Sequence, residues 1–138
     1  MLAIIAPGQG SQTPGMLNAW LEDAQIRTMA QEISDAIGLD VVRLGTTADA
    51  DEIKDTANAQ PLIVAAGLMS AQALGATGSF SYVAGHSVGE ITAAAIAGAL
   101  TPIDAMKLVR ARGVEMAKAA GVTPSGMAAV LGGDRQVV

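Results

Sequence analysis

The chain has 138 residues, of which 51% are hydrophobic and 15% charged, and its net charge is −5. This length suffices for one domain with a sizeable core, and the composition excludes a disordered chain. Because the chain is acidic overall, it has no row of basic side chains that could neutralise phosphate groups. This argues against nucleic acid as the main partner.

The sequence contains no cysteine, which excludes a disulfide framework, a thiolate zinc site and a cysteine nucleophile. The first residues lack a cationic flank and reach a Pro-Gly pair too early for a signal peptide. No apolar run reaches the length of a membrane span. We therefore expect a cytoplasmic protein that neither binds a membrane nor requires a metal or another cofactor.

The first half of the chain is predicted to contain one strand and mostly helices. Residues 2–6 form a continuous apolar run, which predicts a strand buried on both faces. Residues 23–37 have apolar side chains at helical spacing, and Gly38 suits the end of that helix. Residues 39–44 are predicted as a short strand or an extended link, and the acidic residues 49–55 as a short helix.

The next segment is predicted to run from a helix into a strand and a second helix. Pro61 suits the first position of a helix that ends near Gly75. Residues 81–85 are predicted as a strand. The helix that follows, over residues 87–99, is apolar nearly all round, so we expect it at the centre of the fold.

The last predicted helix begins after Thr101 as its cap, with Pro102 as its first residue and Asp104 as the N3 carboxylate, and ends near residue 120. Residues 127–131 are then predicted as a strand. Strands that alternate with helices in this way predict an α/β fold with a largely parallel sheet.

Residues 82–90 join an apolar run to an alanine-rich helix through a Gly-His-Ser-Val-Gly turn. This context is typical of a nucleophile elbow, in which a sharp turn exposes the serine hydroxyl. Gly85 and Gly89 permit the turn, since a Cβ at either position would hinder it. Ser87 is therefore the candidate nucleophile, at a helix N-terminus that favours an oxyanion. The alternative is a capping box between Ser87 and Glu90.

A serine nucleophile needs a general base. The one histidine, His86, adjoins Ser87, and adjacent residues that enter a turn from a strand point to opposite sides. We therefore expect His86 to pack or bind beneath the elbow, and the base is not visible in this chain. In elbow enzymes the residue after the serine, here Val88, and a loop after a neighbouring strand supply the oxyanion N–H groups. Gln9, in the glycine-rich loop of residues 7–12, is the candidate for the second group.

Arg112 shares a helix face with Leu108 and Met116. Arginine is seldom buried without a partner, and its planar fork fits a carboxylate. Two interpretations are open: an ion pair with Glu90 or Glu115, or a clamp for a substrate carboxylate.

Two further residues have weaker signals. Arg110 lies on another face of the same helix and is expected to be solvated. Gln60, just before Pro61, suits a site residue and a simple helix start equally well.

Four motifs together resemble those of the malonyl-CoA:acyl carrier protein transacylases and of the acyltransferase domains of fatty-acid and polyketide synthases. They are Ala6-Pro7-Gly8-Gln9-Gly10-Ser11-Gln12, Ala59-Gln60-Pro61, Gly85-His86-Ser87-Val88-Gly89-Glu90 and Arg112-Gly113. The resemblance implies an α/β-hydrolase-like parallel sheet with flanking helices and an inserted ferredoxin-like subdomain. Residues 1–125 would then belong to the large subdomain, and residues 126–138 would begin the small one.

By this resemblance, Ser87 accepts a malonyl group from coenzyme A and passes it to the phosphopantetheine thiol of acyl carrier protein. The N–H groups of Gln9 and Val88 would form the oxyanion hole, and Arg112 would hold the malonyl carboxylate. The other binding residues of the site would be Gln60 and His86.

In this family the general-base histidine lies well downstream of the serine, so we expect this chain to be an incomplete, inactive portion of a longer polypeptide. A truncated product that works with a complementing chain is the alternative. Two other functions are open: a serine esterase or lipase with the same elbow, and a non-catalytic module that binds coenzyme A or a carrier protein. Val88 after the serine looks more like malonyl-type than methylmalonyl-type members.

Overall fold

The computed structural model describes residues 1–75, 80–123, 132–133 and 136. Strands and helices alternate, which confirms the α/β class. In chain order the elements are β1 (Ala3–Ala6), η1 (Trp20–Glu22), α1 (Ala24–Ile37), α2 (Val41–Thr46), η2 (Glu52–Lys54), α3 (Thr56–Ala73), β2 (Tyr82–Gly85), α4 (Gly89–Ile96) and α5 (Pro102–Val122). The strand predicted over residues 127–131 lies outside the described residues, so the subdomain boundary at residue 126 stays a prediction.

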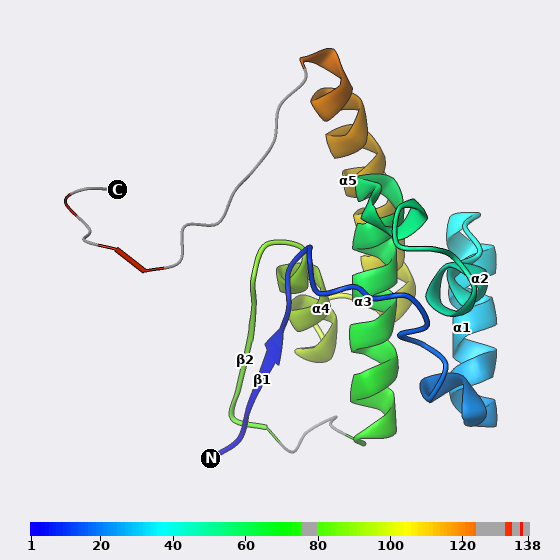
Figure 1. Cartoon of the computed structure of the whole chain (residues 1–138). Helices are drawn as coiled ribbons and strands as arrows, with labels where there is room; N and C mark the ends of the chain where they lie inside the picture. Colours follow the sequence, from blue (N-terminus) through cyan, green and yellow to red (C-terminus); the bar gives the residue numbers. More distant parts are fainter. Residues whose placement is uncertain (76–79, 124–131, 134–135, 137–138) are drawn as a thin grey trace.

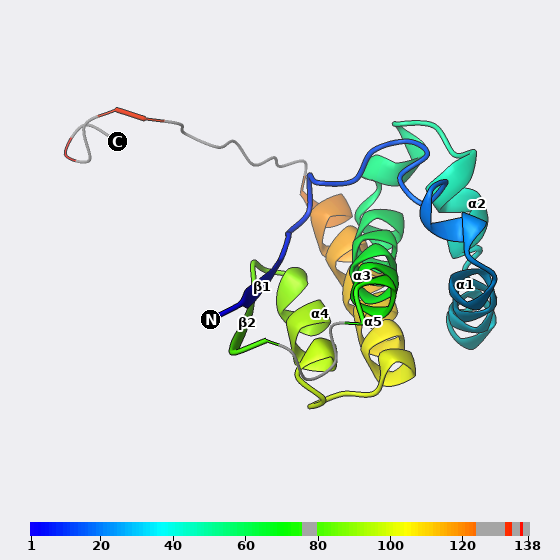
Figure 2. The same ribbon diagram turned by 90° about the horizontal axis from the view of Figure 1, so that it is seen from below.

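The two strands pair in parallel, with Ala3 opposite Tyr82 and Ala6 opposite Gly85. Figure 1 shows the sheet on one side of the molecule and α1 and α2 on the other, with α3, α4 and α5 between them. The same order of layers is seen from below in Figure 2. Because the strands are parallel, their carboxyl ends meet at one edge of the sheet, where the loops that follow them lie side by side.

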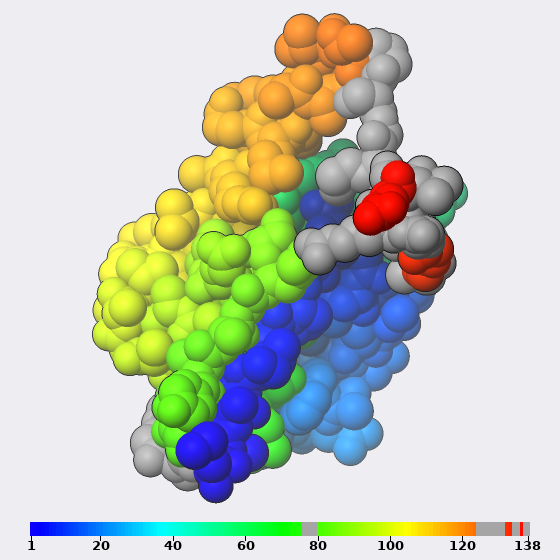
Figure 3. All heavy atoms as spheres, turned by 90° about the vertical axis from the view of Figure 1, so that its left-hand side faces the viewer, coloured from blue at the N-terminus to red at the C-terminus, as the bar shows by residue number. Residues whose placement is uncertain are grey.

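The prediction that residues 2–6 are buried on both faces is wrong for the described chain. Ile5 is 70% exposed and Leu2 54%, whereas Ala6 is 3% exposed. The reason is that α4 packs on one face of the sheet, while the other face lies at the surface in Figure 3.

The hydrophobic core lies among α1, α2, α3 and α5 and consists of aliphatic and methionine side chains. Its largest fully buried members include Leu17, Ile33, Leu44, Ile53, Leu62, Met69, Met106 and Val109. Within the described ranges, no helix combines the length and the apolar composition that crossing a bilayer requires.

The central helix is α3, not α4 as predicted. Every residue of α3 from Ala59 to Ala66 is buried, whereas in α4 only Gly89, Thr92 and Ala93 are. Alanine exposes little apolar area, so an alanine-rich helix loses little at the surface, while the larger Leu, Ile and Val side chains of α3 gain more from burial.

Two predicted helices are confirmed together with their ends. The carboxylate of Asp23 caps α1, and Gly38 ends it in the left-handed conformation with a φ of 60°. The Thr101 hydroxyl accepts a hydrogen bond from the Asp104 amide at 3.1 Å and caps α5.

Residues 39–44 are not a strand or an extended link, because most of them belong to helix α2. The Asp40 carboxylate caps this helix by accepting the Arg43 amide at 2.8 Å. Val41 and Leu44 are both buried, and burial of this helical pair outweighs the strand preference of two adjacent valines. The predicted acidic helix is the single turn η2, with the Asp49 carboxylate accepting the Asp51 and Glu52 amides.

Pro61 lies inside α3 rather than at its first position, because the Asp55 carboxylate caps the helix earlier. Proline lacks an N–H, so the Ala57 carbonyl loses its intrahelical partner. Arg110 Nη1 replaces that partner, donating to the Ala57 oxygen at 2.9 Å. Arg110 is therefore a structural residue that joins α5 to α3, and the expectation that it is solvated is wrong.

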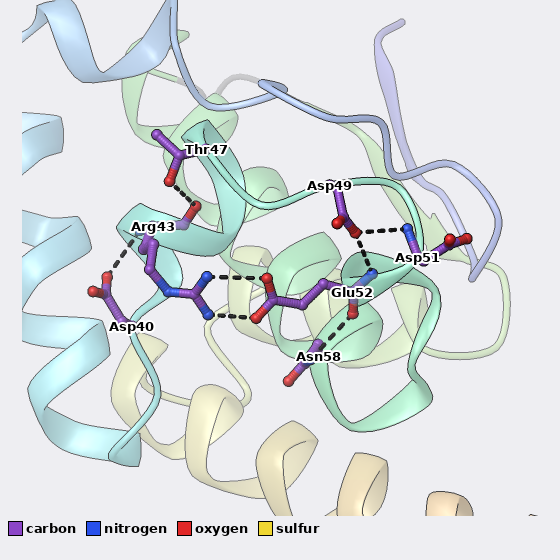
Figure 4. A network of polar contacts seen from close by, with 7 residues as sticks. All are labelled: Asp40, Arg43, Thr47, Asp49, Asp51, Glu52 and Asn58. Carbon is purple, nitrogen blue, oxygen red and sulfur yellow. Dashed lines mark hydrogen bonds and ion pairs between the residues drawn. The ribbon is translucent and has the colours of Figure 1, made fainter.

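An ion pair ties α2 to η2. The Arg43 guanidinium donates to both carboxylate oxygens of Glu52, an arrangement seen in Figure 4. The hydrogen bonds from Arg43 lower the pKa of the Glu52 carboxyl below its ordinary value.

A Glu52→Gln substitution should reduce the free energy of unfolding in a pH-dependent way. Because the pKa of Glu52 is lower in the folded state, its contribution is present above the pKa of an unfolded glutamate and is lost as the pH falls through the folded value. Urea denaturation at several pH values tests this, with Glu32→Gln as the control because no ion pair of the described residues involves Glu32. A difference that persists at acidic pH would contradict the assignment.

Candidate active site

The chain turns sharply between β2 and α4, and Ser87 lies at the tip of the turn. Its φ is 55°, and it is the only non-glycine residue of the described ranges with a positive φ. An L-residue in this conformation is strained by roughly 1–2 kcal/mol. The Ser87 side chain does not cap α4, which begins without a side-chain cap. The capping-box interpretation is therefore wrong, and the strained, exposed serine matches a nucleophile elbow.

Gly85 and Gly89 are needed because backbone segments touch at this turn. A Cβ on Gly85 would collide with the backbone of Gly89, and a Cβ on Gly89 would collide with the carbonyl oxygens of Ala6 and Pro7. Neither glycine has a positive φ. Glycine is therefore required at both positions because it has no Cβ, and the residue with the strained conformation is Ser87.

The loop after β1 is held in place by its own side chains. The Gly10 amide donates to Gln12 Oε1 at 2.8 Å, and Gln12 Nε2 donates to the Ile53 carbonyl at 3.2 Å. The backbone N–H groups of Gln9 and Val88 have no acceptor in the described part of the chain. Two backbone donors at the carboxyl edge of the sheet are thus available to an external oxyanion.

Arg112 connects the elbow to α3. Its Nη2 donates to Ser87 Oγ at 3.3 Å, and its Nη1 donates to Gln60 Oε1 at 2.6 Å. The Gln60 side chain is 1% exposed and its Nε2 donates to Met116 Sδ at 3.2 Å. Arg112 is therefore fixed beside the candidate nucleophile by a buried, neutral partner.

The alternative in which Arg112 forms an ion pair with Glu90 or Glu115 is wrong for the described chain. The ion pairs of the described residues join other cations, and that of Glu115 is with Lys118. Both glutamates nevertheless line the same cleft as Arg112. No carboxylate of the described residues therefore pairs with this guanidinium.

The cleft in front of Ser87 has a volume of about 440 Å³. Polar and apolar side chains of α4 and α5 line it together with the serine: Glu90, Ile91, Leu108, Ala111, Arg112 and Glu115. A separate apolar cavity of about 320 Å³ lies between β1 and α3 and contains none of the predicted site residues.

Close packing of α5 on α3 brings the parts of the site together. Gly113 is buried, and a Cβ there would lie 3.0 Å from the Thr56 carbonyl oxygen. α5 packs directly against α3, and Figure 1 shows the two helices in the middle of the molecule. Because Gly113 adjoins Arg112, this approach sets the distance from the guanidinium to Gln60.

His86 is exposed and is not beneath the elbow as expected. Its ring lies against Gly8, where a Cβ would collide with Nδ1. Among the described residues, the one side chain hydrogen-bonded to Ser87 Oγ is Arg112, a donor that cannot take the serine proton. The described residues also contain no cluster of side chains suited to a metal ion.

The sequence profile of the acyl transferase domain matches residues 4–136. The chain belongs to the acyl transferase family. It is 54% identical to the malonyl CoA-acyl carrier protein transacylase of Mycobacterium tuberculosis, over 100% of this chain and 47% of that protein. Identity to the Escherichia coli protein of the same name is 36%, over 96% of this chain and 44% of the relative.

Solved structures agree with this acyl transferase assignment. The crystal structure of MCAT from Mycobacterium tuberculosis superposes with a TM-score of 0.93 at 53% identity, covering 99% of this chain and 46% of that one. A second neighbour, PlMCAT:AntF, is described as a type II PKS acyl-carrier protein in complex with its malonyl-transacylase, with a TM-score of 0.79 at 32% identity, over 90% of this chain and 40% of that one. The chain thus spans about half the length of the relatives it matches.

The structure brings together four of the residues predicted from the sequence. Ser87, Gln9, Gln60 and Arg112 lie within one hydrogen-bond network. The sequence did not indicate Thr56, whose hydroxyl accepts Gln9 Nε2 at 3.1 Å. No motif could have found it, because this contact depends on how α3 is placed beside the loop.

Strain at the elbow predicts an unusual order of stabilities. Ser87→Gly should be more stable to urea than Ser87→Ala by about 1 kcal/mol, because glycine relieves the positive φ that alanine retains. At Ser70, inside α3, the order should reverse, since glycine within a helix costs about 0.5–1 kcal/mol relative to alanine. Equal stability of the two Ser87 variants of the complete protein would argue against a strained elbow.

Proposed function

We propose that the complete protein transfers a malonyl group from coenzyme A to acyl carrier protein through an ester on Ser87. One observation carries the proposal: a guanidinium that pairs with no carboxylate of the described residues lies 3.3 Å from the hydroxyl of a strained elbow serine. An esterase or lipase would have no need for this charge beside its nucleophile, because simple ester substrates carry no carboxylate there.

In the first half-reaction, Ser87 Oγ attacks the thioester carbonyl of malonyl-CoA. The C–S bond breaks, and the coenzyme A thiolate leaves with the proton that a general base took from the serine. The developing oxyanion accepts hydrogen bonds from the N–H groups of Gln9 and Val88, which are free of other acceptors in the described chain. We assign the base to the part of the protein that corresponds to the unspanned half of the relatives.

Arg112 binds the free carboxylate of the acyl group with paired, charge-assisted hydrogen bonds. Because its Nη2 already reaches Ser87 Oγ, the carboxylate must lie only a few bonds from the ester carbonyl. A malonyl group satisfies this requirement, since one methylene separates its two carbonyl carbons. Gln60 anchors the guanidinium from inside the fold. The exposed His86 is proposed as a further binding residue.

In the second half-reaction, the phosphopantetheine thiol of the carrier protein attacks the serine ester, and Ser87 regains its proton. The carrier as partner is supported by the complex of a malonyl-transacylase with its acyl-carrier protein among the structural neighbours. The printed names of the Mycobacterium tuberculosis and Escherichia coli relatives support the same donor and acceptor. The cytoplasmic location stays a prediction.

The wild-type complete protein should gain one malonyl group when it is mixed with malonyl-CoA in the absence of carrier protein. Ser87→Ala should gain none, because the variant has no hydroxyl to form the ester. Intact-mass spectrometry reads both outcomes, and addition of the carrier protein should remove the group. Failure of the wild-type protein to be labelled, or labelling of Ser87→Ala, would refute the proposal.

Replacement of Arg112 by alanine should reduce malonyl transfer far more than acetyl transfer, because acetyl has no carboxylate. Loss of two hydrogen bonds to a charged group corresponds to about 3 kcal/mol, or roughly a hundredfold in kcat/KM for malonyl-CoA. Steady-state rates with both donors measure the ratio. Equal losses with malonyl-CoA and acetyl-CoA would contradict the clamp and leave a general role for Arg112.

A further inference from the structure

A chain of side-chain hydrogen bonds runs behind the reacting groups. Arg112 Nη1 donates to Gln60 Oε1 at 2.6 Å. Gln60 Nε2 donates to Gln9 Oε1 at 3.4 Å, and Gln9 Nε2 donates to Thr56 Oγ1 at 3.1 Å. This series of hydrogen bonds therefore links Thr56, in the first turn of α3, to Gln9 in the loop after β1 (the oxyanion loop). It also links that loop, through Gln60, to Arg112.

The direction of every bond in this chain follows from the charge at one end. A guanidinium can only donate, so Gln60 must turn its oxygen to Arg112 and its NH₂ group to Gln9. Gln9 must then turn its oxygen to Gln60 and its NH₂ group to Thr56. The Thr56 hydroxyl is the acceptor that completes the chain, and each amide has one orientation that satisfies both neighbours.

The neutral anchor is what leaves the arginine available. Gln60 is 1% exposed, and a carboxylate at this buried position would neutralise Arg112 and compete with a substrate carboxylate. The amide instead holds Nη1 in place without opposing its charge. A salt bridge to a carboxylate would both hold the Arg112 guanidinium in place and neutralise its charge. Gln60 holds the guanidinium in place but leaves its charge available.

From this geometry we infer that Thr56 is a positioning residue of the acyl site, an inference that rests on the proposed function. Its hydroxyl holds the side chain of Gln9, and so restrains the backbone N–H of Gln9 that the proposed function assigns to the oxyanion hole. Through Gln60 the same hydroxyl is coupled to Arg112. The oxyanion loop and the carboxylate clamp therefore respond together when either end of the chain is changed.

Thr56→Val removes the acceptor while it keeps the shape of the side chain. Misplacement of one oxyanion donor should lower kcat by about tenfold with malonyl-CoA and with acetyl-CoA, a fraction of the loss caused by removing such a donor. KM should change less than about twofold, because the contacts that bind the acyl-CoA substrate in the ground state remain. Thr56→Ser, which keeps the hydroxyl, should restore kcat.

The matched control is Thr28→Val, which removes a hydroxyl bonded to the Ala24 carbonyl within α1, far from the site. It should leave kcat unchanged, and urea denaturation should give similar stabilities for both valine variants. The coupling between Thr56 and Arg112 is measured as the effect of Thr56→Val on kcat with acetyl-CoA when Arg112 is also replaced by alanine. There the loss from Thr56→Val should shrink, because no cation sets the direction of the chain.

The outcomes separate this inference from the proposed function. Labelling of wild-type Ser87 by malonyl-CoA is measured first, and its absence would refute the function itself. With labelling intact, an unchanged kcat in Thr56→Val, a Thr56→Ser variant as slow as Thr56→Val, or fully additive losses with Arg112→Ala would each overturn the positioning role.

Discussion

Backbone contact at the carboxyl ends of two short parallel strands is the constraint on which the site depends. The His86 amide donates to the Ala6 carbonyl at 3.1 Å, and Gly89 packs against the carbonyls of Ala6 and Pro7. No side chain fits between these segments. The chain must therefore turn at Ser87, which takes the strained conformation, and the Gln9 loop must lie at the same edge. The serine and the Gln9 and Val88 N–H groups, which have no acceptor among the described residues, therefore lie at one edge of the sheet because the strands end together.

The second constraint is the approach of α5 to α3, which Gly113 permits. It places a buried amide, Gln60, within 2.6 Å of Arg112. The physical consequence is specificity: a cation held by a neutral group keeps its attraction for a carboxylate, whereas a cation held by a carboxylate would lose most of it. Both glutamates of the cleft are left out of this arrangement.

Much of this could be predicted from the sequence, because local signals carry it. The end of α1 at Gly38, the Thr101 cap, the parallel strands and the elbow all follow from residue type and spacing. Several of the predictions that were wrong depended on contacts between residues distant in the chain. Pro61 is tolerated inside α3 because Arg110 bonds the carbonyl it leaves free, and no local rule contains that arginine. The burial predicted for residues 2–6 was wrong because one face of the sheet lies at the surface in the described chain. Thr56 joins the site only through the position of a helix.

The central claim is that Arg112, anchored by Gln60, binds the carboxylate of an acyl group carried on Ser87. A crystal structure of the complete protein after reaction with malonyl-CoA tests it most directly. The account predicts an ester on Ser87 Oγ, its carboxylate bonded to the guanidinium, and Arg112 Nη1 still bonded to Gln60 Oε1. A serine ester whose carboxylate points away from Arg112, or an arginine that leaves Gln60 to pair with Glu90 or Glu115, would contradict it.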